Sequence, residues 1–280
     1  MRNPPTAALA GLMATLIFSL LALAQSQQQG RETSIWKYDG RNRSVGSGGP
    51  APVHDLSGSW AGPRSGAGVR ESTPADVPSF TSLGQKLFSA NKSLGKYNPA
   101  GTNDPVVRTC DPLGFPRADK YSIMEMAFAT MPDRIVVLYP FQQQWREIWM
   151  DGRELPENVG ASEKDAPDPR YYGYSVGRWE SDNTLVVNTT GLDDRTWINE
   201  LGYPHSADAR VQERFTRTDH NDLELAVTID DPKLYTKPFS LGTEYFRWVP
   251  NQILEERLCI PSQVIEYLKA IGDPAGTGKP

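Results

Sequence analysis

The sequence has few residues of the kinds that build metal centres and nucleophilic active sites. Its 280 residues include three scattered histidines and two cysteines, which match no strong pattern of zinc ligands. No Gly-x-Ser-x-Gly turn is present to expose a nucleophilic serine. The glycine-rich run at residues 46–49 has no predicted strand before it or helix after it, so it is not a phosphate-binding loop. No metal and no cofactor is therefore expected.

Basic residues are also in the minority. The chain has 29 Lys and Arg against 34 Asp and Glu, a formal net charge of −5 at pH 7. The two signs are mixed along the chain, so no basic surface is expected for nucleic acid or an anionic membrane. A small molecule is the partner that this composition leaves open.

The one long apolar run lies at residues 7–24, after Arg2 and before a polar stretch. It ends in Ala22-Leu23-Ala24, a small-x-small cleavage signal, and we predict a signal peptide at residues 1–24 and a periplasmic or secreted protein. The alternative is an uncleaved membrane anchor, because 18 mostly apolar residues nearly span a bilayer. Cleavage would leave 256 of the 280 residues, a net charge of −6 and no integral membrane segment.

Cys110 and Cys259 are the two cysteines of the chain. In an oxidising compartment a single disulfide between them is the natural pairing. Two buried free thiols are the alternative.

Short runs of strand length, separated by turn residues, fill the chain from residue 121 onward. Such runs are typical of an antiparallel meander. We predict a first element at residues 54–60 and strands at residues 123–129, 134–139, 144–150, 174–180, 184–190, 209–218, 223–230, 243–249 and 253–258. They predict one domain over residues 54–272, between a polar linker (25–53) and a disordered tail (273–280).

Helices are expected only outside the strand-rich part. Residues 81–94 can hold a short helix, residues 96–118 read as a loop, and Ser262 can cap a C-terminal helix with Leu268 on its apolar face. Without helices between the strands a parallel sheet is excluded. The predicted fold is mainly β: an antiparallel barrel, or a sandwich, with long N-terminal loops and a short C-terminal helix.

The tripeptide Gly58-Ser59-Trp60 resembles the Gly-x-Trp motif that opens the first strand of lipocalins and other calycin-like barrels. The following meander and the C-terminal helix are similar to that layout, and the resemblance implies a lipocalin-like barrel. Residues 61–118 depart from a minimal lipocalin, in which a simpler loop joins the first two strands.

A second resemblance covers most of residues 55–259. Several runs are similar to those of a group of exported bacterial proteins to which no activity is assigned. These runs are GRWE (177–180), TLVV (184–187), DRTW (194–197), PHS (204–206), ERF (213–215), DP (231–232) and YTKP (235–238). Tyr235, in the last of them, is a further candidate ligand contact.

The predicted loop at residues 191–209 gathers polar chemistry. His205 near carboxylates can serve as a general acid or base at neutral pH, and Arg195 can hold an anion. Trp197 is a candidate ring contact, and Asp194 a further ligand contact. The structural alternative is that Asp194 caps a turn, Arg195 pairs with it and Trp197 packs over the barrel end.

Glu213 is the most informative single residue, because it is an acid on a strand face predicted to point inward. In residues 209–218, Val211, Glu213, Phe215 and Arg217 share one face because side chains alternate along a strand. If Val211 and Phe215 face inward, so does Glu213, and a buried carboxylate must be paired, protonated or functional. Arg217 is the structural partner, and His205 or a ligand is the functional one.

Trp145, Glu147 and Trp149 repeat the pattern of an acid between large apolar residues. We predict that they also face the barrel lumen, where the tryptophans would stack on a planar or sugar-like ring. Ordinary core packing of the tryptophans is the alternative. Glu147 and Glu213 could then act as an acid/base pair. Metal sets are conceivable at His205, Asp208 and Glu213, or at Asp193 and Asp194, but their spacing matches no strong pattern.

Three functions follow from these patterns. The preferred one is an exported β-barrel that binds a small aromatic or saccharide-like molecule in its lumen. The second is an enzyme with lyase, isomerase or hydrolase chemistry, in which His205, Glu213 and Glu147 are catalytic. The third is an envelope structural or interaction module. A binder would have a cavity whose carboxylates are tied to arginines, an enzyme would leave His205 and Glu213 free beside one cavity, and a structural module would have no cavity near Glu213.

Overall fold

A computed structural model of the chain describes residues 48–64, 77–94, 101–120, 125–250 and 253–271. The predicted signal peptide, most of the predicted linker and the predicted tail lie outside these residues. None of the helices in these ranges is long and apolar enough to cross a bilayer.

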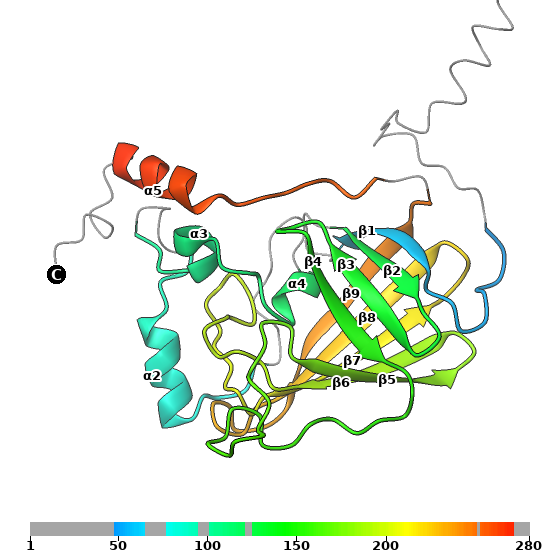
Figure 1. The fold of residues 1–280 in the computed structure, drawn as a ribbon, viewed down its shortest axis with the longest axis horizontal. Helices are drawn as coiled ribbons and strands as arrows, with labels where there is room; N and C mark the ends of the chain where they lie inside the picture. The colour runs from blue at the N-terminus through cyan, green and yellow to red at the C-terminus, as the bar shows by residue number, and fades with distance from the viewer. Residues whose placement is uncertain (1–47, 65–76, 95–100, 121–124, 251–252, 272–280) are drawn as a thin grey trace, which may run out of the picture. The chain divides into compact units, whose positions relative to one another are not determined.

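Nine strands close into a barrel in sequence order, so the barrel prediction is confirmed and the sandwich is not formed (Figure 1). Most strands begin and end within a few residues of their predicted bounds. The strands are β1 (Gly58–Arg64), β2 (Met126–Thr130), β3 (Arg134–Tyr139), β4 (Gln144–Trp149), β5 (Tyr174–Ser181), β6 (Thr184–Thr190), β7 (Arg210–Arg217), β8 (Asp222–Asp230) and β9 (Phe239–Trp248).

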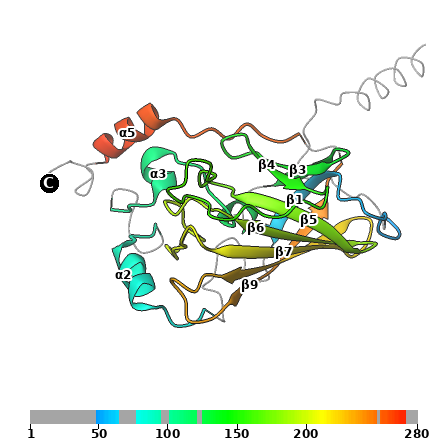
Figure 2. The same cartoon turned by 60° about the horizontal axis from the view of Figure 1, so that its bottom comes forward.

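One neighbouring pair departs from the predicted antiparallel order. Strands β4 and β5 run parallel and pair at only two positions, Ile148 with Ser175 and Trp149 with Val176. A parallel neighbour requires the chain to return along the strand before it pairs, and residues 150–173 provide this return. The barrel is therefore mixed, and the β4–β5 junction, here called the seam, is its least paired wall. In Figure 2, β4, β5, β6 and β7 follow one another across that wall.

The alternation predicted for β7 and β8 is confirmed. Val211, Glu213, Phe215 and Arg217 are buried on β7, and the odd-numbered residues of β8 are buried between its more exposed neighbours. Phe215 meets Phe128 of β2 edge to face across the interior, with ring centroids 5.4 Å apart. Each such aliphatic or aromatic side chain stabilises the fold by about 1.5–3 kcal/mol on full burial.

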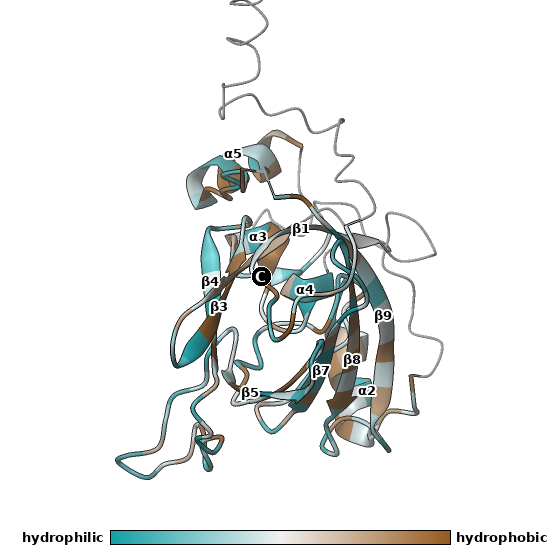
Figure 3. Cartoon of the chain, turned by 90° about the vertical axis from the view of Figure 1, so that its right-hand side faces the viewer, coloured by the Kyte–Doolittle hydropathy of each residue, from teal (hydrophilic) through white to brown (hydrophobic). Residues whose placement is uncertain are grey.

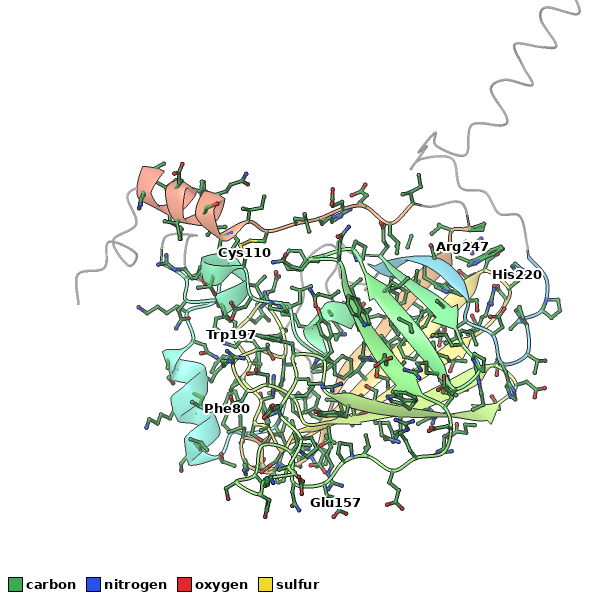
Figure 4. The ribbon with its side chains drawn as sticks, viewed as in Figure 1. Phe80, Cys110, Glu157, Trp197, His220 and Arg247 are labelled. Carbon is green, nitrogen blue, oxygen red and sulfur yellow. A yellow bond between two sulfur atoms is a disulfide. The ribbon has the colours of Figure 1, made fainter. Side chains whose placement is uncertain are left out.

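The end of the barrel near the start of β1 is closed by aromatic and arginine side chains. Trp60 is fully buried and donates from Nε1 to the carbonyl of Leu56 at 2.9 Å. The guanidinium of Arg217 lies 5.0 Å from the Trp60 ring centroid and donates to the carbonyls of Asp55 and His220. Arg217 therefore serves the closed end and is not the partner of Glu213. Figure 4 shows His220 and Arg247 at this end, with Trp197 and Phe80 at the opposite one.

Three short helices lie at the opposite, loop-bearing end. Thr81 caps α2 (Ser82–Ala90) by accepting from the Gly84 amide at 3.1 Å, as the predicted helix requires. The predicted loop at residues 96–118 was partly wrong, because it contains α3 (Pro105–Thr109) and the start of α4 (Arg117–Lys120). All four residues of α4 are buried. Figure 3 shows α4 between the β3–β4 side and the β9 side of the barrel.

The C-terminal part leaves the barrel. Cys110 and Cys259 form the predicted disulfide, with their Cα atoms 5.4 Å apart. The predicted strand at residues 253–258 is wrong: its one ladder contact is an isolated bridge between Arg257 and Phe141. The predicted terminal helix is α5 (Pro261–Ala270), although no side chain caps it and Leu268 is its one buried residue.

Candidate functional site

Four buried polar side chains meet inside the barrel, and we call them the lumen cluster: Asp119, Tyr139, Arg146 and Glu213. They come from α4, β3, β4 and β7. Arg146 donates from Nη2 to both oxygens of Glu213, at 2.9 and 2.7 Å. Its Nη1 lies 3.7 Å from Asp119 Oδ2, and the Tyr139 hydroxyl donates to Asp119 Oδ1 at 2.5 Å. Glu213 thus faces inward as predicted, with Arg146 as its partner.

The lumen cluster places two carboxyl groups beside one arginine. Burial raises the pKa of Glu213 well above its usual range, and Asp119 raises it further although Arg146 opposes the shift. Asp119 Oδ2 makes no hydrogen bond among the described residues. The raised pKa favours the protonated form of Glu213, as expected where a second carboxyl group shares the same buried site.

A second buried ion pair lies beside it. Lys120 of α4 donates from Nζ to Glu244 of β9 at 2.5 Å, and both side chains are almost fully buried. An unpaired buried charge costs several kcal/mol, so each cation needs its own carboxylate. The charge that Lys120 of α4 brings into the barrel is therefore paired with an opposite charge on Glu244.

Several buried polar atoms near the seam make no hydrogen bond to the described residues. Within the described residues, Arg146 Nε and Nη1 and the Tyr172 hydroxyl make no hydrogen bond. The Tyr172 ring stacks on Tyr139, with centroids 5.4 Å apart, and burial raises the pKa of Tyr172. A buried polar group without a partner costs about 1–3 kcal/mol, which marks this part of the molecule as a place for a bound polar group.

A partly open cavity of about 220 Å³ lies at the seam, and we call it the seam cavity. Its lining includes Trp145, Arg146, Arg170, Tyr171, Tyr172 and Tyr174. Most of this lining is aromatic. Two of the residues connect the cavity to the lumen cluster: Arg146 belongs to the cluster, and Tyr172 stacks on Tyr139. Water occupies about 30 Å³ per molecule in the liquid, so the cavity has room for one small ring.

The predicted inward face of β4 was wrong. Trp145 is 63% exposed, whereas Arg146 and Ile148 are buried. The register explains the choice, because Val137 and Ile135 of the inward face of β3 pair with Arg146 and Ile148. Trp145, Glu147 and Trp149 therefore lie on the outer face, although all three border the seam cavity.

The two other outer-face residues of β4 are already engaged. Glu147 accepts from Arg134 Nη1 at 2.7 Å. The guanidinium groups of Arg134 and Arg153 lie 3.6 and 3.4 Å from the Trp149 ring centroid, and two groups so close must occupy opposite faces of the ring. Trp149 keeps no free face for a ligand, and Glu147 has no direct path to Glu213 to act as its acid/base partner.

His205 is buried in the loop between β6 and β7 and makes its hydrogen bonds within that loop. Its Nε2 lies 2.7 Å from Thr196 Oγ1 and its Nδ1 3.1 Å from the Ser206 carbonyl. Burial lowers its pKa below the usual 6.5. Both ring nitrogens have partners, and His205 shares no hydrogen-bonding partner with Glu213 among the described residues. The two predicted acid/base residues are not brought to one cavity.

The predicted pairing of Arg195 with Asp194 is wrong by one residue. Arg195 forms a two-pronged contact with Asp193, with Nη2 to Oδ2 at 2.5 Å, and this contact lowers the pKa of Asp193. Asp194 is exposed. The Arg195 guanidinium also lies 5.2 Å from the Tyr171 ring centroid, which leaves it near the seam cavity but bound to an acid of its own.

Trp197 and Tyr235 pack inside the loop-bearing end. Trp197 is buried and bridges to Pro204. The Tyr235 hydroxyl donates to the Pro204 carbonyl at 2.8 Å, and its ring contacts Phe239 and Phe80. Neither residue borders the seam cavity, so the predicted ligand contacts at these positions have structural partners instead.

The conceivable metal sets are not assembled. Among the described residues, no three His, Cys, Asp or Glu side chains lie close enough to hold a metal ion. Asp208 pairs with Lys233, and Glu213 pairs with Arg146.

A larger hollow of about 520 Å³ is lined by residues of strands β5 to β8 and by Glu154, Leu155 and Pro238. Its described lining includes Asn188, Arg210, Gln212, Thr228 and Asp230 and no aromatic side chain. These residues point outward from their strands, and Gln212 is hydrogen-bonded to Asn188 at 3.0 Å. The hollow therefore lacks the ring contacts and buried charges of the seam cavity.

The residues of the site that were not predicted include Asp119, Tyr139, Arg146, Arg170, Tyr171, Tyr172 and Tyr174. Arg146 had a signal, since it alternates with Ile148 on β4, but the flanking tryptophans favoured the other face. Asp119 lies on a four-residue helix and Arg170 on a loop, where no periodicity indicates direction.

Comparison with known proteins adds no relative: neither protein-family models nor curated proteins match this chain. The fold and the site together define a closed, mixed nine-stranded β-barrel with an ionised interior and an aromatic cavity at its seam. Its function has to be inferred from that geometry.

Proposed function

We propose that this chain is an exported, calycin-like β-barrel that binds a small single-ring molecule, aromatic or saccharide-like, in the seam cavity. One observation carries the proposal. Arg146 borders the cavity and at the same time neutralises Glu213, so a cavity exists beside carboxylates that are already tied to arginines. This is the arrangement expected of a binder.

The same geometry disfavours the two alternative functions. An acid/base enzyme would need His205 and Glu213 free beside one cavity, and each has its own partners. A structural module would need no cavity near Glu213, and the seam cavity is separated from Glu213 by one side chain.

The size of the seam cavity limits the ligand. An apolar protein cavity of about 150 Å³ holds a benzene ring, and drug-sized ligands occupy about 300–1,000 Å³. At about 220 Å³, the seam cavity fits one ring with a small substituent. Trp145 and Tyr171 are the rings placed to contact it, since both border the cavity without being fully buried.

Three further features support the exported, calycin-like part of the proposal. Trp60 of the Gly-x-Trp motif lies at the closed end of the barrel under Arg217. The Cys110–Cys259 disulfide suits an oxidising compartment. The apolar run at residues 7–24 suits a signal peptide.

Isothermal titration with a small panel tests the proposal: benzoate, benzamide, glucose and glucosamine. We expect at least one of them to bind with a Kd below about 1 mM, and Tyr171→Ala or Trp145→Ala to weaken that binding by about tenfold or more. Tyr245→Ala is the matched control, because Tyr245 is an exposed aromatic on β9 that does not border the cavity. If no member binds, or if Tyr245→Ala weakens binding as much as Tyr171→Ala, the proposal is wrong.

A further inference from the structure

Arg170 gives the lining of the seam cavity a positive charge that is not paired with an acid among the described residues. It borders the cavity and is exposed. In the described part of the chain it forms no ion pair, and its guanidinium instead lies 4.4 Å from the Tyr174 ring centroid.

The backbone holds Arg170 firmly in place. Its amide donates to the Gly191 carbonyl at 3.0 Å, and its own carbonyl accepts from the amides of Gly173 and Asp193, both at 3.0 Å. The Tyr174 hydroxyl donates to the Asp168 carbonyl at 2.8 Å, which fixes the ring beneath the guanidinium. Arginine is favoured over an aromatic face, so the cation is positioned before any ligand arrives.

The other charges that border the cavity are cancelled. Glu147 is paired with Arg134, and Arg146 is paired with Glu213 and lies near Asp119. Among the described lining residues this leaves Arg170 as an uncompensated positive charge, in a chain whose overall charge is −5. A planar guanidinium matches the two oxygens of a carboxylate.

We infer that the seam cavity selects a small acid: a single planar ring that bears a carboxylate, with the carboxylate on Arg170 and the ring against Trp145 and Tyr171. This inference rests on the proposed function, because it names the chemical class of the ligand of the same cavity. It moves the anion-holding role predicted for Arg195 to Arg170, since Arg195 is neutralised by Asp193.

Benzoate and benzamide test this inference directly, because they have nearly the same size and shape and differ in charge. We expect the protein to bind benzoate about tenfold or more tightly than benzamide, as a charge-assisted contact predicts. Raising the salt concentration should weaken benzoate binding and leave benzamide binding unchanged. Arg170→Gln should remove most of the preference while keeping benzamide binding. Arg178→Gln is the matched control, since Arg178 is an exposed arginine on β5 that does not border the cavity.

Each contrary outcome has a distinct meaning. Equal binding of benzoate and benzamide, or benzoate binding that survives Arg170→Gln, would overturn the charge selectivity and leave the proposed function intact. Binding of glucose or glucosamine alone, sensitive to Tyr171→Ala, would do the same. If none of these compounds binds, both the inference and the proposed function fail.

Discussion

Two polar clusters of the described residues, the His205 cluster and the lumen cluster, differ in how completely their buried atoms are paired. In the His205 cluster, which comprises Asp193, Arg195, Thr196 and His205, both imidazole nitrogens and both Asp193 oxygens have partners. In the lumen cluster, Nε and Nη1 of Arg146 make no hydrogen bond among the described residues. Pairing that is complete marks a structural cluster, and pairing that is incomplete beside a cavity marks a binding site.

The difference follows from how each cluster is assembled. The residues of the His205 cluster are near neighbours in sequence, so a loop can fold until each finds a partner. Those of the lumen cluster are held by separate strands and a helix, with Arg146 and Glu213 separated by 67 residues. Their positions are set by the barrel, and atoms that the barrel does not pair stay available to a ligand.

The largest effect is expected from breaking the lumen cluster. Arg146→Met removes the one cation that faces Asp119 and Glu213, and should lower the free energy of unfolding by about 3–5 kcal/mol. Urea denaturation of the variant at pH 7 measures this. A loss of less than about 1 kcal/mol would mean that the cluster is already neutral without Arg146.

A rescue sharpens the same point. Arg146→Met combined with Glu213→Leu replaces the ion pair by apolar side chains, and such replacements are often neutral or stabilising. The double variant should therefore recover most of the stability that the single variant loses. If the double variant loses as much stability as the two single variants together, Arg146 and Glu213 are not energetically coupled.

Stability should depend on pH in opposite directions for the two clusters. The pKa of Glu213 is raised in the folded state above the usual 4.5. Its contribution to stability is full below about pH 4.5 and is lost as the pH rises through the folded-state value. Urea denaturation between pH 4.5 and 8 should show a smaller fall in the free energy of unfolding for Glu213→Gln than for the unchanged protein. An equal fall would contradict a raised pKa for Glu213.

His205 has the reverse dependence. Its pKa is lowered by burial below 6.5, so its contribution is full above pH 6.5 and is lost as the pH falls through the folded-state value. The unchanged protein should lose stability below pH 6.5 relative to His205→Gln. At pH 7, His205→Gln should lower the free energy of unfolding by about 1–3 kcal/mol, because it disturbs buried hydrogen bonds to Thr196 and Ser206. Curves that stay parallel from pH 7 to 5 would show that His205 does not titrate in this way.

The smallest effect is expected in the exposed part of the His205 cluster. Arg195 is 65% exposed in its pair with Asp193, and exposed ion pairs contribute about 0–1 kcal/mol. Arg195→Met should therefore lower the free energy of unfolding by less than about 1 kcal/mol, measured by the same urea denaturation as for Arg146→Met. Equal losses for the two variants would erase the distinction between the clusters.

Alternation and turn residues predicted much of the barrel. The bounds of β3 and β6 match their predictions, and Glu213 faces inward because Val211 and Phe215 do. The parallel seam was not predictable, since no local pattern shows that residues 150–173 return along the barrel. Alternation also leaves two possible inward faces on β4, and only the pairing with β3 decides that Arg146 faces inward.

A crystal structure of the protein grown with benzoate tests the central claim most directly. We predict benzoate in the seam cavity, with its carboxylate on Arg170 and its ring against Trp145 and Tyr171. Benzoate beside His205, benzoate in the hollow lined by β5 to β8, or no bound benzoate at concentrations well above its measured Kd would contradict the account.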